Sequence, residues 1–147
     1  MLGLTIYQNK IFVGGNLPNN LYVINLSNVS DILTIPVGEI PTSVSVFNNI
    51  IYIAFGFNSG KIASYDLLGN LINSNFYNPS FGGKCLGLTV DKNILYTSII
   101  EFNAIDKIVL PLPPSPNIIS GDDLNIFYSK KDRKKTSRRI KKYIDKL

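Results

Sequence analysis

An all-β fold built from repeated sheets is predicted by two features of the sequence. The first is an internal repeat: residues 2–15, 41–55 and 85–99 each contain an apolar strand, a polar turn with an Asn and a second apolar strand. The second is composition, because Val, Ile, Tyr and Phe dominate these strands and favour β-structure over helix. A period of about 40 residues is typical of a four-stranded propeller blade. The predicted fold is therefore a partial β-propeller of about three four-stranded blade-like repeats.

Polar turns divide each repeat into strand pairs. Asn9, Asn49 and Asn93 stand in the three corresponding turns, 40 and 44 residues apart. Asn tolerates the positive φ of tight hairpin turns, so each is expected between two antiparallel strands. Residues 38–41 and 82–84 contain Gly and are predicted to be the loops between repeats.

The second half of the repeat also recurs. Residues 21–28 correspond to residues 62–70, and residues 32–35 and 71–74 follow them as outer strands. In the second of these units an Asp is followed three residues later by Gly-Asn, which is strong turn chemistry. Asp66 is therefore expected to accept hydrogen bonds from backbone amides rather than to act as an acid.

The repeats resemble two known propeller repeat families. The stretches that resemble the YVTN-type repeat are residues 22–25, 34–38, 41–46 and 51–54, and residues 62–72 resemble the NHL repeat. The resemblance extends over roughly residues 2–110, and it implies propeller blades without implying one function. The chain departs from the pattern at Asn48-Asn49, which replaces the usual Asp-Gly turn, and at residues 110–116, which are Pro-rich where an outer strand belongs.

The number of repeats is too small to close a ring. Closed propellers usually have at least about four blades, and each blade must stack its apolar faces on neighbours. Three blades alone leave two apolar faces exposed. We therefore expect either that several chains associate to complete the ring or that another segment covers the end blades.

The chain changes character after the repeats. The predicted domains are a propeller-like repeat domain at 1–112, a Pro/Gly linker at 113–123 and a basic tail at 124–147, which is helical or disordered. Residues 124–128 have the composition of one more strand. The tail carries the positive charge of the chain, because residues 1–118 contain five Lys against six acidic residues.

Composition restricts the functional classes. The chain has no His and one Cys, which removes the commonest general base and any intramolecular disulfide. The apolar runs are far shorter than the roughly 20 residues that a spanning helix needs, so no transmembrane segment is expected. The N-terminal residues show no signal-peptide pattern, and an intracellular or virion location is predicted.

The basic tail contains the strongest candidate site. Dense positive charge attracts phosphates through counterion release, so the tail is predicted to contact nucleic acid, an anionic membrane or an acidic protein face. A solvated tail without a dedicated partner is the competing interpretation. The predicted polyanion- or partner-binding residues are Lys130, Lys131, Arg133, Lys134, Lys135, Arg138, Arg139, Lys141 and Lys142.

A short apolar stripe lies within the same tail. Ile140, Tyr143, Ile144 and Leu147 follow the spacing of one helix face. The stripe is predicted to dock on an exposed blade face, with binding to a membrane surface as the alternative.

Other candidate chemical features favour structural roles. Cys85 begins an apolar strand and is predicted to be buried, since no His is present to activate it. The Gly83-Lys84 pair lacks the flanking residues of a phosphate-binding loop and is assigned to a loop between blades. No metal ligands show a recognisable spacing, so neither a metal nor a cofactor is expected.

These observations predict a non-catalytic structural or interaction module. Its protein partner is expected to be further copies of the chain or a larger assembly, such as a viral particle, and the tail adds contact with nucleic acid or another polyanion. Two alternatives stay open: a propeller hydrolase or lactonase-like enzyme, and a nucleic-acid or membrane-surface binder that acts through its tail.

Overall fold

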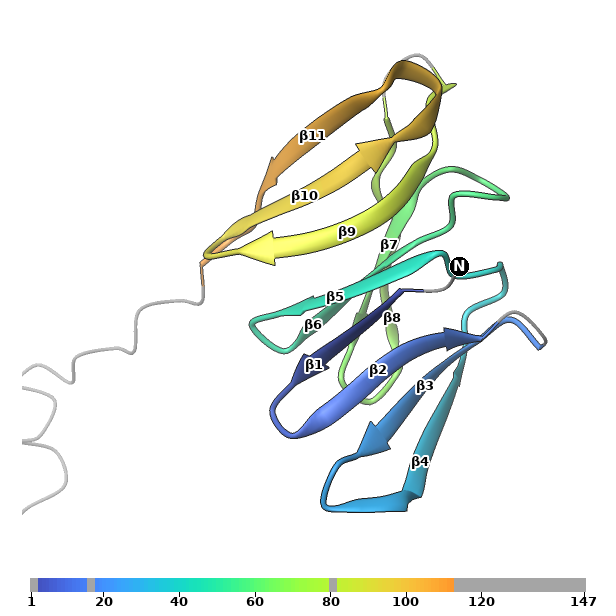
Figure 1. Ribbon diagram of the computed structural model, residues 1–147, viewed down its shortest axis with the longest axis vertical. Coiled ribbons are helices and arrows are strands. Elements are labelled where there is room, and N and C mark those ends of the chain that lie inside the picture. The colour runs from blue at the N-terminus through green and yellow to red at the C-terminus, as the bar shows by residue number, and fades with distance from the viewer. Residues whose placement is uncertain (1–2, 16–17, 80–81, 113–147) are drawn as a thin grey trace, which may run out of the picture. The chain divides into compact units, whose positions relative to one another are not determined.

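The computed structural model describes residues 3–15, 18–79 and 82–112, and residues 1–112 form one compact unit (Figure 1). Within these ranges the chain forms three antiparallel sheets and no α-helix, so the prediction of an all-β fold is confirmed for them. The predicted linker at 113–123, the strand at 124–128 and the basic tail lie outside the described residues.

The first sheet is a meander of four strands in chain order. Its strands are β1 (Leu4–Tyr7), β2 (Lys10–Gly15), β3 (Asn20–Asn25) and β4 (Asn28–Pro36). Gln8 and Asn9 both have positive φ in the β1–β2 turn, as the Asn-containing hairpin predicts. The outer strand predicted at residues 32–35 lies within β4, and the outer strand predicted at residues 71–74 lies within a strand of the second sheet.

The second sheet repeats this topology. Its strands are β5 (Ser43–Phe47), β6 (Ile50–Ala54), β7 (Ile62–Asp66) and β8 (Leu71–Tyr77). Asn48 and Asn49 both adopt positive φ, so they form the same kind of turn that Gln8 and Asn9 form. Asp66 Oδ1 accepts hydrogen bonds from the backbone N–H groups of Leu68 and Asn70 at 2.9 and 2.8 Å, which confirms its predicted role.

The third sheet has three strands in the described residues. They are β9 (Cys85–Asp91), β10 (Ile94–Ile99) and β11 (Ala104–Val109), with a 3-10 helix, η2 (Ile100–Phe102), before β11. Its first turn differs from the other two, because Lys92 rather than the Asn has the positive φ. Asn93 instead holds the end of the sheet, where its carbonyl accepts a hydrogen bond of 2.7 Å from the Leu110 N–H.

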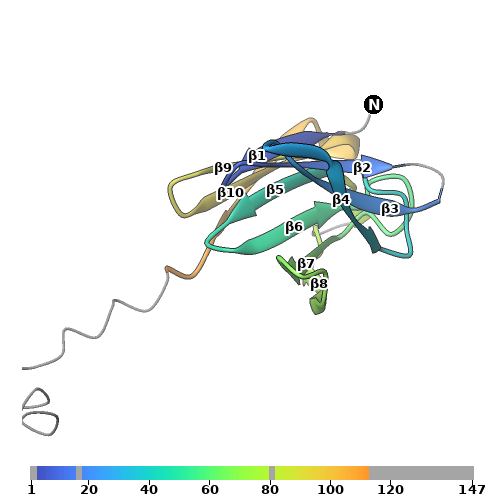
Figure 2. The ribbon, with the colours of Figure 1, turned by 90° about the horizontal axis from the view of Figure 1, so that it is seen from below.

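The three sheets stack face to face. β1, β5 and β9, the first strands of the three sheets, lie side by side, and Figure 2 shows the second sheet extending from β5 beside β1 to β8 at its far edge. We call the face of a sheet that points to the preceding sheet its leading face, and the opposite face its trailing face. One core lies between the first and second sheets and another between the second and third.

Polar groups join the sheets at the starts of these first strands. Gly3 N–H donates to the Thr42 carbonyl at 2.9 Å, and Leu88 N–H donates to Ser43 Oγ at 3.0 Å. Cys85 N–H donates to the Gly60 carbonyl at 2.9 Å. The outermost strands β4 and β8 are largely exposed, so burial is concentrated on the inner strands of the stack.

Candidate interaction surfaces

The leading face of the first sheet is apolar and has no described segment packed over its edge strands. Directly opposed residues of antiparallel strands share a face, so the register assigns this face two cross-strand rows. One row is Leu4, Val13, Tyr22 and Thr34, and the other is Ile6, Ile11, Ile24 and Ile32. Leu4 is 63% exposed and Ile6 is 62% exposed. A contiguous apolar surface of this kind is typical of a binding surface.

The trailing face of the third sheet combines apolar and polar residues. Tyr96 on β10 stands opposite Thr89 on β9 and Lys107 on β11. Beside this row Ile105 and Val109 are exposed, Val109 at 74%. The Lys107 ammonium lies 5.9 Å from the centre of the Tyr96 ring, within the range of a cation–π interaction. This face is therefore amphipathic, unlike the leading face of the first sheet.

A hollow marks the middle of this mixed face. It has a volume of about 250 Å³ and is lined by residues that include Thr89, Tyr96, Ser98 and Ile105. Gly87 also lines the hollow, and its N–H donates to Ser98 Oγ at 3.0 Å. The third sheet thus presents an open recess that is lined in part by the Tyr96 ring.

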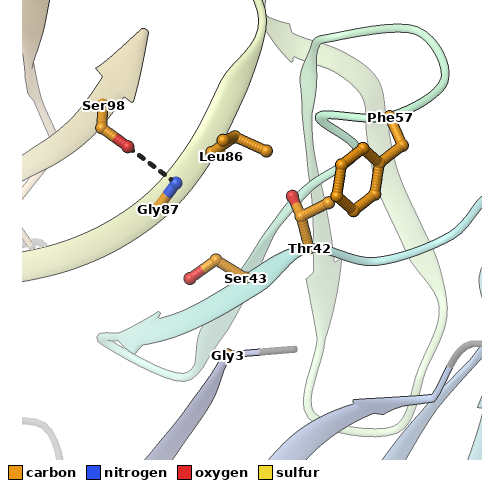
Figure 3. Close-up of a pocket in the computed structure, with 7 residues that line it drawn as sticks. All are labelled: Gly3, Thr42, Ser43, Phe57, Leu86, Gly87 and Ser98. Atoms are coloured by element: carbon orange, nitrogen blue, oxygen red, sulfur yellow. Dashed lines mark hydrogen bonds between the residues drawn. The ribbon is translucent and has the colours of Figure 1, made fainter. Parts of the chain in front are cut away.

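A second pocket lies where the first strands of the three sheets begin. It has a volume of about 470 Å³, and Figure 3 shows the seven residues that line it. The lining consists of Gly3, Thr42, Ser43, Phe57, Leu86, Gly87 and Ser98. It contains no acidic or basic side chain, and its chemistry is that of hydroxyl groups, one Phe and one Leu.

The hydroxyl groups of this pocket hold the sheets together. Thr42 Oγ1 donates to the Ala54 carbonyl at 3.1 Å and accepts from Gly56 N–H at 3.1 Å. Ser43 Oγ accepts from the Leu88 N–H, and Ser98 Oγ accepts from the Gly87 N–H, the bond drawn in Figure 3. These hydroxyls therefore form hydrogen bonds that connect neighbouring strands and neighbouring sheets.

The titratable groups near the stack also serve structure. Burial raises the pKa of the Cys85 thiol, whose side chain is completely buried as predicted. The Tyr77 hydroxyl on β8 donates to Asp106 Oδ2 on β11, which links the second and third sheets. Burial and then this hydrogen bond raise the pKa of Tyr77 to about 12. Hydrogen bonds from Asn70 hold the pKa of Asp66 below its usual value.

Each of the two loops between sheets contributes one residue to an ion pair. Lys61 Nζ lies 3.4 Å from Glu39 Oε1, and Lys84 Nζ lies 3.8 Å from Glu101 Oε1. Lys84 belongs to the loop that the sequence assigned between the second and third repeats, and its backbone N–H also donates to Glu101 at 2.7 Å. Among the described residues, no three His, Cys, Asp or Glu side chains gather in a metal-binding arrangement.

The site residues predicted from the sequence belong to the tail and not to these surfaces. The nine tail cations (Lys130, Lys131, Arg133, Lys134, Lys135, Arg138, Arg139, Lys141 and Lys142) lie outside the described residues, as do the four stripe residues (Ile140, Tyr143, Ile144 and Leu147). Their roles stay predictions. No helix in the described part of the chain has the length and hydrophobicity needed to cross a membrane.

Sequence reasoning did not single out the pocket at Thr42 and Ser43. Its residues come from all three repeats, and only stacking brings them together. The one available signal is the recurrence of small residues at equivalent positions: Gly3, Ser43 and Gly87 each lie six residues before the turn Asn.

Comparison with known proteins supports the fold alone. No protein-family model and no curated protein matches the chain. Among solved structures, the computationally designed Ika4 protein is similar at 14% identity and a TM-score of 0.52, with 74% of this chain and 64% of that chain covered. The designed Ika8 protein is similar at 14% identity and a TM-score of 0.53, with 73% and 32% covered.

A third similar structure is that of an inactive enzyme variant. A catalytically inactive virginiamycin B lyase from Staphylococcus aureus, solved with quinupristin, matches at 16% identity and a TM-score of 0.54, covering 76% of this chain and 42% of that one. It is a propeller protein, and the similarity is weak. The chain spans less than two thirds of the length of all three structures, and these identities relate folds rather than activities.

Proposed function

We propose that this chain is a non-catalytic interaction module: a partial propeller of the YVTN or NHL type that completes its stack by self-association or within a larger assembly. The observation that supports the proposal most is the apolar leading face of the first sheet. The corresponding faces of the second and third sheets are covered by a neighbouring sheet, whereas Leu4 and Ile6 are exposed. Exposed apolar surface of this extent is stabilised by a partner.

The composition of the pocket lining supports a scaffold role over chemistry. Thr42, Ser43 and Ser98 use their hydroxyls to accept backbone N–H groups, which fixes the strands. Cys85 is fully buried with a raised pKa, so its thiol is held in its unreactive, protonated form. The groups that a hydrolase needs for acid–base or nucleophilic work are thus committed to structure in this region.

Molar mass in solution tests the self-association. We expect the full chain to sediment at a mass above that of a single chain, with dissociation on dilution, because the two free faces bury apolar surface only in contact with another molecule. Analytical ultracentrifugation over a range of concentrations measures this. A single-chain mass at every concentration, together with an unchanged thermal midpoint on dilution, would contradict the proposed self-association.

The tail is the proposed polyanion contact. Its nine Lys and Arg residues within positions 130–142 favour binding through counterion release, so binding to single-stranded nucleic acid or heparin should weaken steeply with salt. Replacing the nine residues by Gln is expected to abolish binding in a fluorescence titration. The matched control replaces the exposed body residues Lys10 and Lys92 by Gln, and equal losses in both variants would exclude the tail as the site.

A further inference from the structure

The two free faces of the stack are of opposite kinds. Among the described residues, no segment covers the leading face of the first sheet or the trailing face of the third sheet, and at both internal junctions a leading face packs on a trailing face. We propose that a second copy of this chain occupies both, so that the first sheet of each copy stacks on the third sheet of the other. The inference rests on the proposed self-association and specifies its geometry.

The trailing faces share an aromatic anchor. Phe12, Tyr52 and Tyr96 each lie three residues after the turn Asn of their repeat, on the second strand of their sheet. Phe12 and Tyr52 are both only 1% exposed, because the next sheet covers them. Tyr96 holds the same position in the third sheet and is half-buried. Tyr96 is therefore an aromatic anchor whose covering sheet must come from outside the described chain.

The leading faces share an aliphatic position. Ile11, Ile51 and Leu95 each lie two residues after the turn Asn. Ile51 and Leu95 are fully buried against the preceding sheet, whereas Ile11 is half-buried on the free face. The residues that flank it, Leu4 and Ile6, are equivalent in the same way to Val44 and Val46, which are buried in the first core. The free leading face thus carries the pattern of the two faces that are already packed.

Polar residues on the free trailing face also have buried counterparts. Thr89 is equivalent to Ser45, which lies four residues before its turn Asn and is buried on the trailing face of the second sheet. Ser98 is equivalent to Ala54, another small buried residue. The trailing face of the third sheet therefore matches that of the second sheet at its small inner-strand residues and at one aromatic position, although the second sheet adds further aromatic side chains, Phe47 and Phe76.

Two charged residues depart from the pattern. Asp91 takes the place that the partly buried Phe47 has in the second sheet. Lys107 stands opposite Tyr96, at the place that the buried Ser64 takes opposite Tyr52. The long aliphatic stem of a Lys covers apolar surface while its ammonium reaches solvent at the rim of an interface. With Lys107 in the place of a Ser, the proposed contact between two copies is weaker than the contacts between sheets within one chain, but it can still form.

The number of copies follows from the number of sheets. Propellers usually contain about 4–8 blades, and two copies of a three-sheet chain supply six. A head-to-tail contact closes a ring when its rotation allows and otherwise forms an open filament. Two copies joined by two identical contacts give the smallest ring in which no end face remains free.

Complementation between two variants tests this pairing with the full chain. Ile11→Asp places a charge on the leading face, and Tyr96→Asp places one on the trailing face. Each variant alone carries the defect in both contacts of the ring, so each is expected to sediment as a single chain, with a loss of affinity of at least about tenfold. An equimolar mixture is expected to form a two-chain species, because one contact between the two variants carries no substitution.

A control and the contrary outcomes complete the experiment. Leu68→Asp alters an exposed turn residue, 78% exposed and outside both end faces, and should associate like the unaltered chain. Circular dichroism of each variant confirms that the sheets remain folded. The pairing is overturned if Tyr96→Asp associates normally, if the mixture stays as single chains, or if the unaltered chain grows into filaments.

Failure of this inference is separable from failure of the proposed function. An unaltered chain that associates, with both Asp variants unaffected, keeps self-association and rejects these two faces. A single-chain mass for the unaltered protein rejects self-association itself. Association that begins only after Ile140→Asp and Tyr143→Asp assigns the free face to the chain's own tail and also overturns the pairing.

Discussion

The second sheet and the first sheet carry the same pattern of residues and have opposite surroundings. Ile51 and Tyr52 on the second sheet are buried on opposite faces, one in each core. Ile11 and Phe12 hold the equivalent positions on the first sheet, and only Phe12 is buried. Alternation along a strand therefore defines two apolar faces, while burial depends on whether a neighbouring sheet is present on each side.

Truncation of the equivalent isoleucines is the strongest way to break this comparison. Ile51→Ala is expected to lower the free energy of unfolding by about 2–5 kcal/mol, because a cavity forms in a closed core. Ile11→Ala, measured on dilute single chains, is expected to cost about 1 kcal/mol or less, because its face is open to solvent. Urea denaturation measures both, and equal losses would show that the leading face of the first sheet is covered within the chain.

Replacing two glycines by Ala tests the junction between the second and third sheets against the trailing face of the third sheet. A Cβ at Gly56 would lie 2.5 Å from the Cys85 carbonyl oxygen, so Gly56→Ala should force the second and third sheets apart and cost about 1–3 kcal/mol. A Cβ at Gly87 would meet only Ser98 Oγ, at 3.1 Å, and Gly87→Ala should cost well under about 1 kcal/mol. Thermal melts distinguish them, and the opposite ranking would contradict the assigned packing.

Replacement of the positively charged residue on the trailing face of the third sheet sharpens the comparison further. Lys107→Ser gives the third sheet the residue that the second sheet has at that place, and it removes a charge that contact would partly desolvate. We expect self-association to tighten by a factor of about three to ten, as measured by sedimentation equilibrium. Unchanged or weaker association would mean that this face does not take part.

The hydrogen bond that links the second and third sheets should weaken at alkaline pH. The pKa of Tyr77 is raised to about 12 in the folded chain by burial and by Asp106, above its usual value of about 10. Its contribution is fully present below the unfolded pKa and is lost as pH rises through the folded pKa, so stability should fall between about pH 10 and pH 12. We expect the dependence of stability on pH, measured by urea denaturation, to be steeper for the unaltered chain than for Tyr77→Phe in this window, and parallel curves would contradict the link.

Much of the fold is predictable because it is local. The Asn48-Asn49 turn, the Asp66 turn and the strands around them depend on φ preferences and on alternation, which residues close in sequence determine. The third sheet has three strands in the described residues where a four-stranded repeat was predicted, and most of the Pro-rich stretch that follows Leu110 lies outside those residues. The all-β class follows from the same local patterns.

The candidate surfaces were less predictable. The sequence indicated two apolar end faces, and the structure gives one apolar face and one amphipathic face with Lys107 beside Tyr96. The reason is that residues 104–109, which form β11, were not matched to the recurring segments 21–28 and 62–70, so the position of Lys107 opposite Tyr96 was not predicted. The pocket at Thr42 and Ser98 was missed because its members come from three repeats that are far apart in sequence.

By itself, the sequence determined that this protein consists of tandem antiparallel sheets with apolar alternation and tight Asn turns, and that its positive charge is concentrated in the tail. Only the tertiary structure decided which of two equally apolar faces is buried, as Ile51 is and Ile11 is not. Burial of a residue depends on whether another sheet packs against it. The sequence of a strand in an end sheet does not specify whether such a sheet is present.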